Sequence, residues 1–306
     1  MIRRYLRELS VAVVLGALLL ALALMGSSFF RDRNLLVKSA PVLLVAVGMT
    51  LVILARQIDI SVGSQLSIGV ILAGLLATAG LPWPLVMALV LLGGASMGAI
   101  NGLLVAGLGL PSIVVTLATM VIGREALRWW RGGESVLDLP SSFQWFGAGQ
   151  DAGQWLVVGV ALAVWLVFAL GLHHLAAGRA VYATGSDPEA ARLAGIQPRR
   201  VVLGVFVLLG ALTGLAAVLL TMRFVGVATN AGEGVELKVI AAVVVGGTAV
   251  SGGRGTLLGT LLGVALLESI GPALVHLGVS AHWEKAWQGA LLLVAVASDS
   301  LVRRTR

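Results

Sequence analysis

The chain has 306 residues, of which 58% are hydrophobic and 11% are charged. A soluble globular protein carries about a quarter charged residues, so this composition excludes a soluble domain and indicates an integral membrane protein. The absence of cysteine excludes disulfide bonds and thiolate metal sites. The net charge of +7 comes from arginines at span ends and at the termini, so it indicates orientation in a membrane rather than nucleic-acid binding.

Ten apolar segments predict membrane-spanning helices, because a bilayer core of about 30 Å needs roughly 20 apolar residues per helix. We therefore expect an all-α, polytopic fold, with one transmembrane domain covering residues 1–306. The first apolar run follows arginines, as a secretory signal does, but no convincing small-residue cleavage site follows it, and we expect a retained helix. The expected spans are 10–29, 40–56, 62–80, 84–107, 111–130, 153–173, 201–222, 236–250, 254–277 and 285–301.

Charged and aromatic residues at the span ends predict the orientation. Arginines cluster before the first span and after the last, and an even number of crossings places both ends on one side, which the positive-inside rule makes cytoplasmic. Seven of the eight tryptophans fall at or beyond the opposite span ends, where an indole suits the membrane interface. The terminal arginines are Arg3, Arg4, Arg7, Arg303, Arg304 and Arg306.

A polar island, residues 182–200, separates the sixth and seventh spans and predicts a short cytoplasmic helix. Asp187 is a good N-cap, and Pro188 suits the first helical position, where its missing N–H has no cost. Glu189 lies at the positive end of the helix dipole, and Gly195 can adopt the left-handed conformation that ends a helix. A capped helix between spans indicates a contact with a cytoplasmic partner; the alternative is a solvated loop.

Two glycine- and serine-rich breaks fall at span ends, in residues 58–64 and 246–255. Non-helical backbone at membrane depth survives only where protein or a water-filled cavity satisfies it, so both breaks predict proximity to a pathway. The two breaks also have the layout of a weak internal repeat. Polar residues in the spans could face this pathway or only hydrogen-bond to neighbouring helices. The candidates are Asp59, Ser61, Asn101, Thr116, Gly246 and Gly247.

Ionisable residues within the spans are few. Glu125 and Arg128 are three residues apart and can pair on one helix face. Asp59 could pair with Arg56 or cap the next span. Glu268 lies deep in the ninth span without a cation nearby in the sequence, so it is either a buried, hydrogen-bonded carboxyl group or a functional group. No phosphate loop, catalytic set or metal-ligand spacing is present in the sequence, so we expect no catalytic residue, no metal and no cofactor.

Several ordered segments resemble the permease subunits of bacterial ABC sugar importers, in the branch that handles ribose, rhamnose and autoinducer-2. The resemblance covers roughly residues 40 to 300. Two sites depart from the family pattern: Arg56-Gln57 replace a frequent glycine, and Lys238 replaces a frequent acidic residue. The segments that carry the resemblance are IDISVGS (58–64), NGLLV (101–105), TLATM (116–120), GSDPEAARLAGI (185–196) and the run from 231 to 263.

The resemblance implies a membrane core of two permeases, the second being a copy or a paralogue. It also implies two ABC ATPase subunits and an extracytoplasmic sugar-binding protein. The polar island then corresponds to the ATPase-docking segment, where small Ala190 and Ala191 would allow close approach. The expected ATPase-coupling residues are Asp187, Glu189, Ala190, Ala191, Arg192 and Gly195.

These observations predict a multi-pass permease of the bacterial inner membrane that contacts lipid and binds no nucleic acid. It would translocate a small sugar or sugar-like molecule while its partners hydrolyse ATP, so the chain itself is not expected to be an enzyme. The first alternative is an ion- or proton-coupled secondary transporter, for which Glu268 is the one deep carboxylate. A second alternative, a membrane scaffold without transport, would not explain the two glycine-rich breaks.

Overall fold

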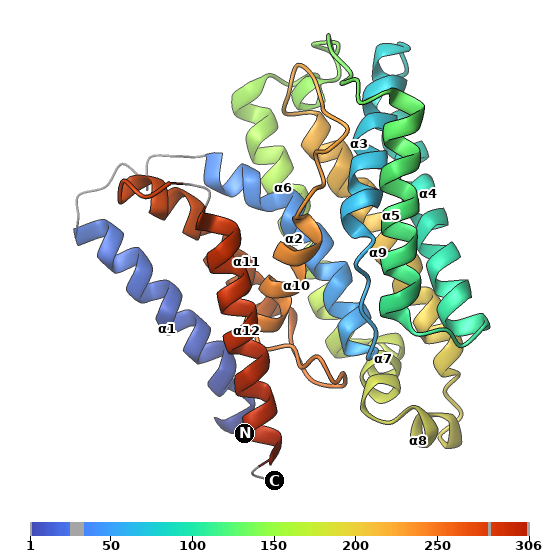
Figure 1. Cartoon of the computed structure of the whole chain (residues 1–306), viewed down its shortest axis with the longest axis vertical. Helices are drawn as coiled ribbons and strands as arrows, with labels where there is room; N and C mark the ends of the chain where they lie inside the picture. Colours follow the sequence, from blue (N-terminus) through green and yellow to red (C-terminus); the bar gives the residue numbers. More distant parts are fainter. Residues whose placement is uncertain (1, 25–33, 281–282, 305–306) are drawn as a thin grey trace.

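The computed structural model describes residues 2–24, 34–280 and 283–304 of the chain. Within these ranges the protein forms twelve α-helices and no β-strand, and the helices pack into an elongated bundle (Figure 1). The all-α, polytopic fold is as the sequence predicts. The helices are α1 (Ile2–Leu24), α2 (Asn34–Leu54), α3 (Val62–Thr78), α4 (Trp83–Gly102), α5 (Ser112–Arg131), α6 (Gln150–His174), α7 (Ala176–Ser186), α8 (Pro188–Leu193), α9 (Pro198–Thr221), α10 (Val235–Val245), α11 (Leu257–His276) and α12 (Trp283–Arg304).

Each of the ten predicted spans coincides with one helix, and α7 and α8 are the two additional helices. Among the described residues, five helices are long and apolar enough to cross a membrane by themselves: α2, α4 with the π-helical turn that follows it, α6, α9 and α11. Helix α10 has 11 residues, or about 16 Å, which is too short to cross a bilayer core. It ends at Val245, before the predicted limit of 250, because Gly246 and Gly247 begin a loop. The predicted end of the first span, residues 25–29, lies outside the described residues.

Helix α9 lies at the centre of the bundle and packs against α2, α3 and α4. Its closest neighbour is α4, and glycines make this approach possible. A Cβ atom added at Gly210 would collide with the carbonyl oxygen of Gly94, and one added at Gly98 would collide with that of Phe206. A Cβ at Gly214 would lie 2.6 Å from the carbonyl oxygen of Val90. Small residues thus bring two backbones together, as expected for helices that associate in lipid by van der Waals packing.

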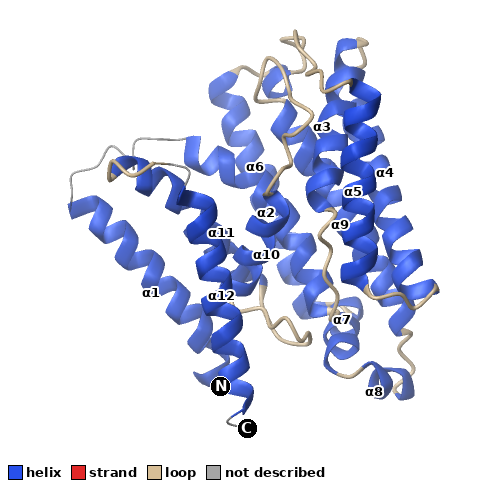
Figure 2. Cartoon of the chain, in the orientation of Figure 1, coloured by secondary structure: helices blue, strands red, loops and turns tan. Residues whose placement is uncertain are grey.

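Different segments of the chain lie at the two ends of the bundle (Figures 1 and 2). The start of α1, the end of α12, and the helices α7 and α8 all lie at one end of the molecule. The long loop after α5 lies at the other end. There Val136 pairs with Val227 in an isolated antiparallel bridge, and Trp83 packs edge-on against Phe146 with ring centroids 5.3 Å apart.

Candidate functional site

Helix α8 is the short, capped helix that the sequence predicts. It begins after Asp187, whose carboxylate accepts hydrogen bonds from the backbone N–H groups of Glu189 at 3.0 Å and Ala190 at 3.1 Å. Two otherwise unpaired donors of the first turn are therefore satisfied. Gly195 has φ = +83°, the left-handed conformation expected after a helix end, and its N–H donates to the carbonyl of Arg192 at 3.0 Å.

The exposed face of α8 differs from the expected one. Ala191 is only 3% exposed because it packs inside the chain, so of the two expected alanines only Ala190 is free to approach a partner. The Glu189 carboxylate accepts from the Arg192 guanidinium at 2.6 Å, so these two expected coupling residues form one exposed pair. Sequence reasoning missed Leu193, which is 82% exposed. The available signal was an apolar residue in an otherwise polar helix outside the spans.

Helix α7 connects α8 to the glycine-rich break 246–255 and to the end of α2. The hydroxyl group of Tyr182 donates to the carbonyl of Gly255 at 2.8 Å. The N–H of Gly253 donates at 2.9 Å to the carbonyl of Leu54, the last residue of α2. At Gly185 there is no space for a side chain, because a Cβ atom would collide with that same carbonyl. The end of α7, the loop 246–256 and the end of α2 therefore form one packed junction.

Three of the predicted pathway residues meet in a buried polar cluster at the start of α3. Asp59 accepts from the backbone N–H of Ser61 at 2.8 Å and from its hydroxyl group at 2.5 Å. The Asn101 amide of α4 donates to the Ser61 hydroxyl at 2.8 Å, and the Gln65 amide donates to the same oxygen at 2.7 Å. All four residues are buried. Asp59 thus holds the start of α3, and no ion pair joins it to Arg56 among the described residues.

The other predicted pathway residues take packing roles in this conformation. The hydroxyl group of Thr116 donates to the carbonyl of Ser112 in its own helix at 2.8 Å. Gly246 lets the end of α10 touch α11, since a Cβ there would collide with the carbonyl of Gly259. Gly247 follows with φ = +97° and belongs to the loop. The sequence leaves two alternatives for Thr116 and Asn101, a pathway or hydrogen bonds to helices. The observed contacts are hydrogen bonds, within its own helix for Thr116 and to Ser61 for Asn101.

A charged cluster joins α10, α11 and α12, and sequence reasoning did not assemble it. The Lys238 ammonium group lies 2.7 Å from a carboxylate oxygen of Glu268 and 3.2 Å from one of Glu284. Gln288 donates to that same Glu284 oxygen at 2.9 Å. Glu268 is 7% exposed and is thus a buried, paired carboxylate. Its cation comes from another span, so no local spacing predicts the pair. The predicted pair of Glu125 and Arg128 forms at 2.9 Å.

Comparisons with known proteins agree with this architecture. The protein family described as "Branched-chain amino acid transport system / permease component" matches residues 33–296. The ribose import permease protein RbsC of Escherichia coli is 33% identical over 97% of this chain and 95% of its own length. The autoinducer 2 import system permease protein LsrC of Escherichia coli is 36% identical over 94% of this chain and 86% of its own. The corresponding protein of an Enterobacter species is 35% identical over 97% and 88%. No solved structure matches the chain.

The similarity extends over nearly the whole chain, so it confirms the resemblance that the ordered motifs indicate. The protein is a translocation subunit rather than an enzyme, as expected, and its apolar helices fit a multi-pass protein of the inner membrane. This membership favours the permease of an ABC importer over an ion-coupled secondary transporter. The chain belongs to the family of permease components of branched-chain amino acid transport systems.

Proposed function

We propose that this permease imports a small neutral sugar or sugar-like molecule, of the kind carried by ribose and autoinducer 2 permeases. The relatives bearing those names cover nearly the whole chain. The structural observation that carries the proposal is the exposed, capped helix α8, which is tied through α7 to the loop between α10 and α11 and to the end of α2. A permease that is driven by a separate ATPase subunit needs a rigid surface element that contacts this subunit.

The coupling surface comprises the exposed residues of α8 and its cap. The Asp187 cap fixes the first turn, and the Glu189–Arg192 pair and Leu193 project outward. A groove on an ATPase subunit would receive the apolar Leu193 beside the charged pair. Gly195 ends the helix and allows the chain to return to α9. Movement of the ATPase would then displace α8 and α7 as one unit.

The displacement would reach the transmembrane helices through the packed junction formed by the end of α7, the loop 246–256 and the end of α2. The loop 246–256 connects α10 to α11, and the segment 55–61 connects α2 to α3. The loop 246–256 contacts α7 through Tyr182, and it contacts the last residue of α2, next to the segment 55–61, through the bond from Gly253 to Leu54. We therefore place the moving parts of the pathway at the starts of α3 and α11 and at α10. The buried cluster around Asp59 would open only in another conformation.

We assign the proposed partners to the two ends and the sides of the molecule. Two ATPase subunits would bind the end that carries α8, which we assign to the cytoplasm together with both termini. A sugar-binding protein would approach the opposite end, where the long loop after α5 lies. A second permease, either a copy or a paralogue, would complete the membrane core, and lipid would surround it.

The test is uptake by the reconstituted system. Cells that lack their own ribose uptake would express the permease with an ATPase and a sugar-binding protein from the same organism, and uptake of radiolabelled ribose and leucine would be measured. We expect ribose uptake that requires the ATPase and persists when the proton gradient is collapsed while ATP is maintained. Leucine uptake without ribose uptake would refute the substrate class, and uptake that follows the proton gradient would refute the energy source.

A further inference from the structure

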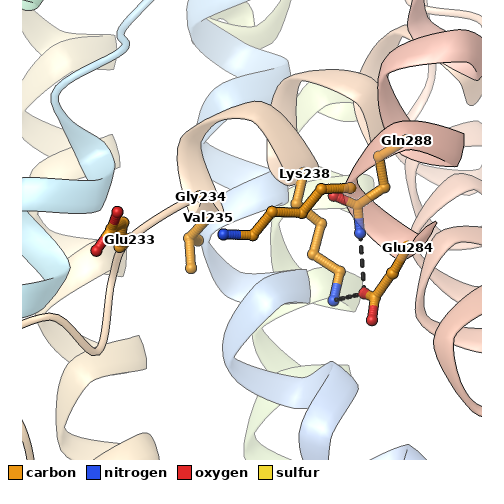
Figure 3. A pocket seen from close by; sticks show the side chains of 7 residues that line it. Glu233, Gly234, Val235, Lys238, Glu284 and Gln288 are labelled. Atoms are coloured by element: carbon orange, nitrogen blue, oxygen red, sulfur yellow. Dashed lines mark hydrogen bonds and ion pairs between the residues drawn. The ribbon is translucent and has the colours of Figure 1, made fainter. Parts of the chain in front are cut away.

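A pocket of about 460 Å³ lies between the start of α10 and the start of α12 (Figure 3). Sites for small molecules typically have about 300–1,000 Å³, so this volume can hold a small metabolite. Five of the seven lining residues have polar or charged side chains, whose aliphatic stems and the side chain of Val235 add apolar surface. The lining residues are Glu233, Gly234, Val235, Lys238, Glu284, Lys285 and Gln288.

One wall of the pocket is held rigidly by the ion cluster of α10, α11 and α12. The Lys238 ammonium group bonds to both Glu268 and Glu284, and Gln288 bonds to Glu284, as the dashed lines to Glu284 in Figure 3 show. The Glu284 carboxylate lies against the backbone of α11 at Gly271, where a side chain would collide with it. These groups are paired with one another, so they position the wall rather than offer free charges.

The opposite wall is non-helical backbone anchored to α3. The N–H of Gly232 donates to the hydroxyl group of Ser67 at 3.0 Å, and a Cβ at Gly232 would collide with the carbonyl of Gly63. Residues 232–234 are non-helical and lie directly before the start of α10. Irregular backbone among membrane helices is tolerated where it packs against protein or lines a cavity, and this segment does both.

Two side chains of the pocket have no ion-pair partner within the described parts of the chain. They are Glu233, which is exposed, and Lys285, whose ammonium group lies near Gly234. One supplies carboxylate acceptors and the other supplies ammonium donors. The formal charges of the lining cancel, because two carboxylates face two ammonium groups. A neutral ligand with several hydroxyl groups, each both donor and acceptor, matches this lining better than an anion or a cation does.

We propose that the pocket between α10 and α12 binds a neutral polyhydroxylated molecule, with Glu233 and Lys285 as its hydrogen-bonding side chains. This inference rests on the proposed function and assigns a binding site for the transported molecule to the permease itself. The pocket also adjoins α10, whose far end reaches the loop held by α7.

The first experiment measures ribose uptake by the Glu233→Gln and Lys285→Gln variants in the full transport system. Each change removes one charge-assisted hydrogen bond, and we expect uptake to fall about tenfold, which corresponds to about 1.4 kcal/mol. Glu134→Gln is the matched control, because it removes an exposed carboxylate from the loop after α5. Membrane levels and ATPase co-purification should remain normal in all three variants. Wild-type uptake in both pocket variants would overturn the inference.

The second experiment uses the absence of cysteine in the natural sequence. A Lys285→Cys variant would be labelled with a water-soluble thiol reagent in the presence and absence of millimolar ribose. We expect ribose to slow the labelling, whereas labelling of Ser141→Cys in the distant loop should not change. Protection by leucine and not by ribose would overturn the ligand class. Failure of the wild-type system to take up ribose would instead refute the proposed function, so the two failures are distinguishable.

Discussion

The hydroxyl group of Tyr182 in α7 donates a 2.8 Å hydrogen bond to the carbonyl oxygen of Gly255, in the loop between α10 and α11. That loop is also bonded to the end of α2 through Gly253 and Leu54. A displacement of α8 therefore has a direct route through α7 to the loop between α10 and α11 and to the end of α2. In the proposed importer, this contact transmits the movement of the ATPase to the pathway.

Replacing the tyrosine at this contact should uncouple transport from ATP hydrolysis. Tyr182→Phe removes the hydroxyl group and one hydrogen bond worth about 0.5–1.5 kcal/mol, but it keeps the ring that packs beside the loop. We expect normal membrane levels and normal ATPase co-purification, with a severalfold fall in sugar uptake per ATP hydrolysed. The measurement is uptake and ATPase activity in proteoliposomes. An unchanged ratio would show that the contact has no role in coupling.

The sequence predicts the helices and the cap of α8 because these depend on local properties. Apolar run length defines a span, and Asp187, Pro188 and Gly195 fall at positions where capping chemistry is specific. The sequence likewise predicts the location of α10, but the predicted end at residue 250 lies five residues beyond the observed end at Val245. Apolar character continues through the loop after Val245, and the glycines there, rather than hydropathy, end the helix.

The ion cluster and the pocket could not be predicted, because they depend on which helices are neighbours. Lys238 and Glu268 are 30 residues apart, and Glu284 is on a third helix. Two signals are available in the sequence, the unusual cation Lys238 and the deep carboxylate Glu268 without a cation nearby in the sequence. The buried state of Ala191 is also a tertiary effect, since both alanines look equivalent in a six-residue helix.

The orientation can be tested with single cysteines at the two ends of the molecule. Ser141 lies in the loop after α5, and Ser186 is exposed at the end of α7. We expect Ser141→Cys to react with an impermeant thiol reagent added outside intact cells. Ser186→Cys should react with this reagent only after the cells are permeabilised. Labelling of both from the same side would refute the assignment of α8 to the cytoplasm.

The ion cluster predicts unequal effects of removing its members. Lys238→Met leaves Glu268 and Glu284 without their shared cation, and breaking a buried pair in this way costs about 3–5 kcal/mol. We expect a large loss of folded permease and a lower melting temperature in detergent. Glu268→Gln should be milder and retain substantial uptake, because Lys238 keeps its 3.2 Å contact with Glu284. Equal damage from both changes, or loss of uptake in Glu268→Gln at normal protein levels, would contradict this interpretation.

The end of α8 provides a test of ATPase docking that leaves the membrane domain intact. Gly195 has φ = +83°, and an added Cβ would meet nothing within 4 Å, so Gly195→Val acts through backbone strain alone. Such strain costs about 1–3 kcal/mol and should distort the coupling surface. Gly80→Val is a matched control, because Gly80 also has a positive φ, +82°, and open space, but lies in the turn between α3 and α4. We expect normal membrane levels for both variants and loss of ATPase co-purification only for Gly195→Val.

A charge reversal on the same helix tests the surface itself. Glu189→Lys replaces the partner of Arg192 with a second cation, and the exposed pair contributes little to folding, so the permease should remain stable. At an interface, a like-charge contact costs several kcal/mol, so ATPase co-purification and sugar uptake should both fall strongly. Glu134→Lys, an exposed charge reversal in the loop after α5, should leave ATPase binding unchanged. If Glu189→Lys and Gly195→Val both bind the ATPase and import sugar normally, α8 is a solvated segment and ATPase coupling must be sought elsewhere on the cytoplasmic face.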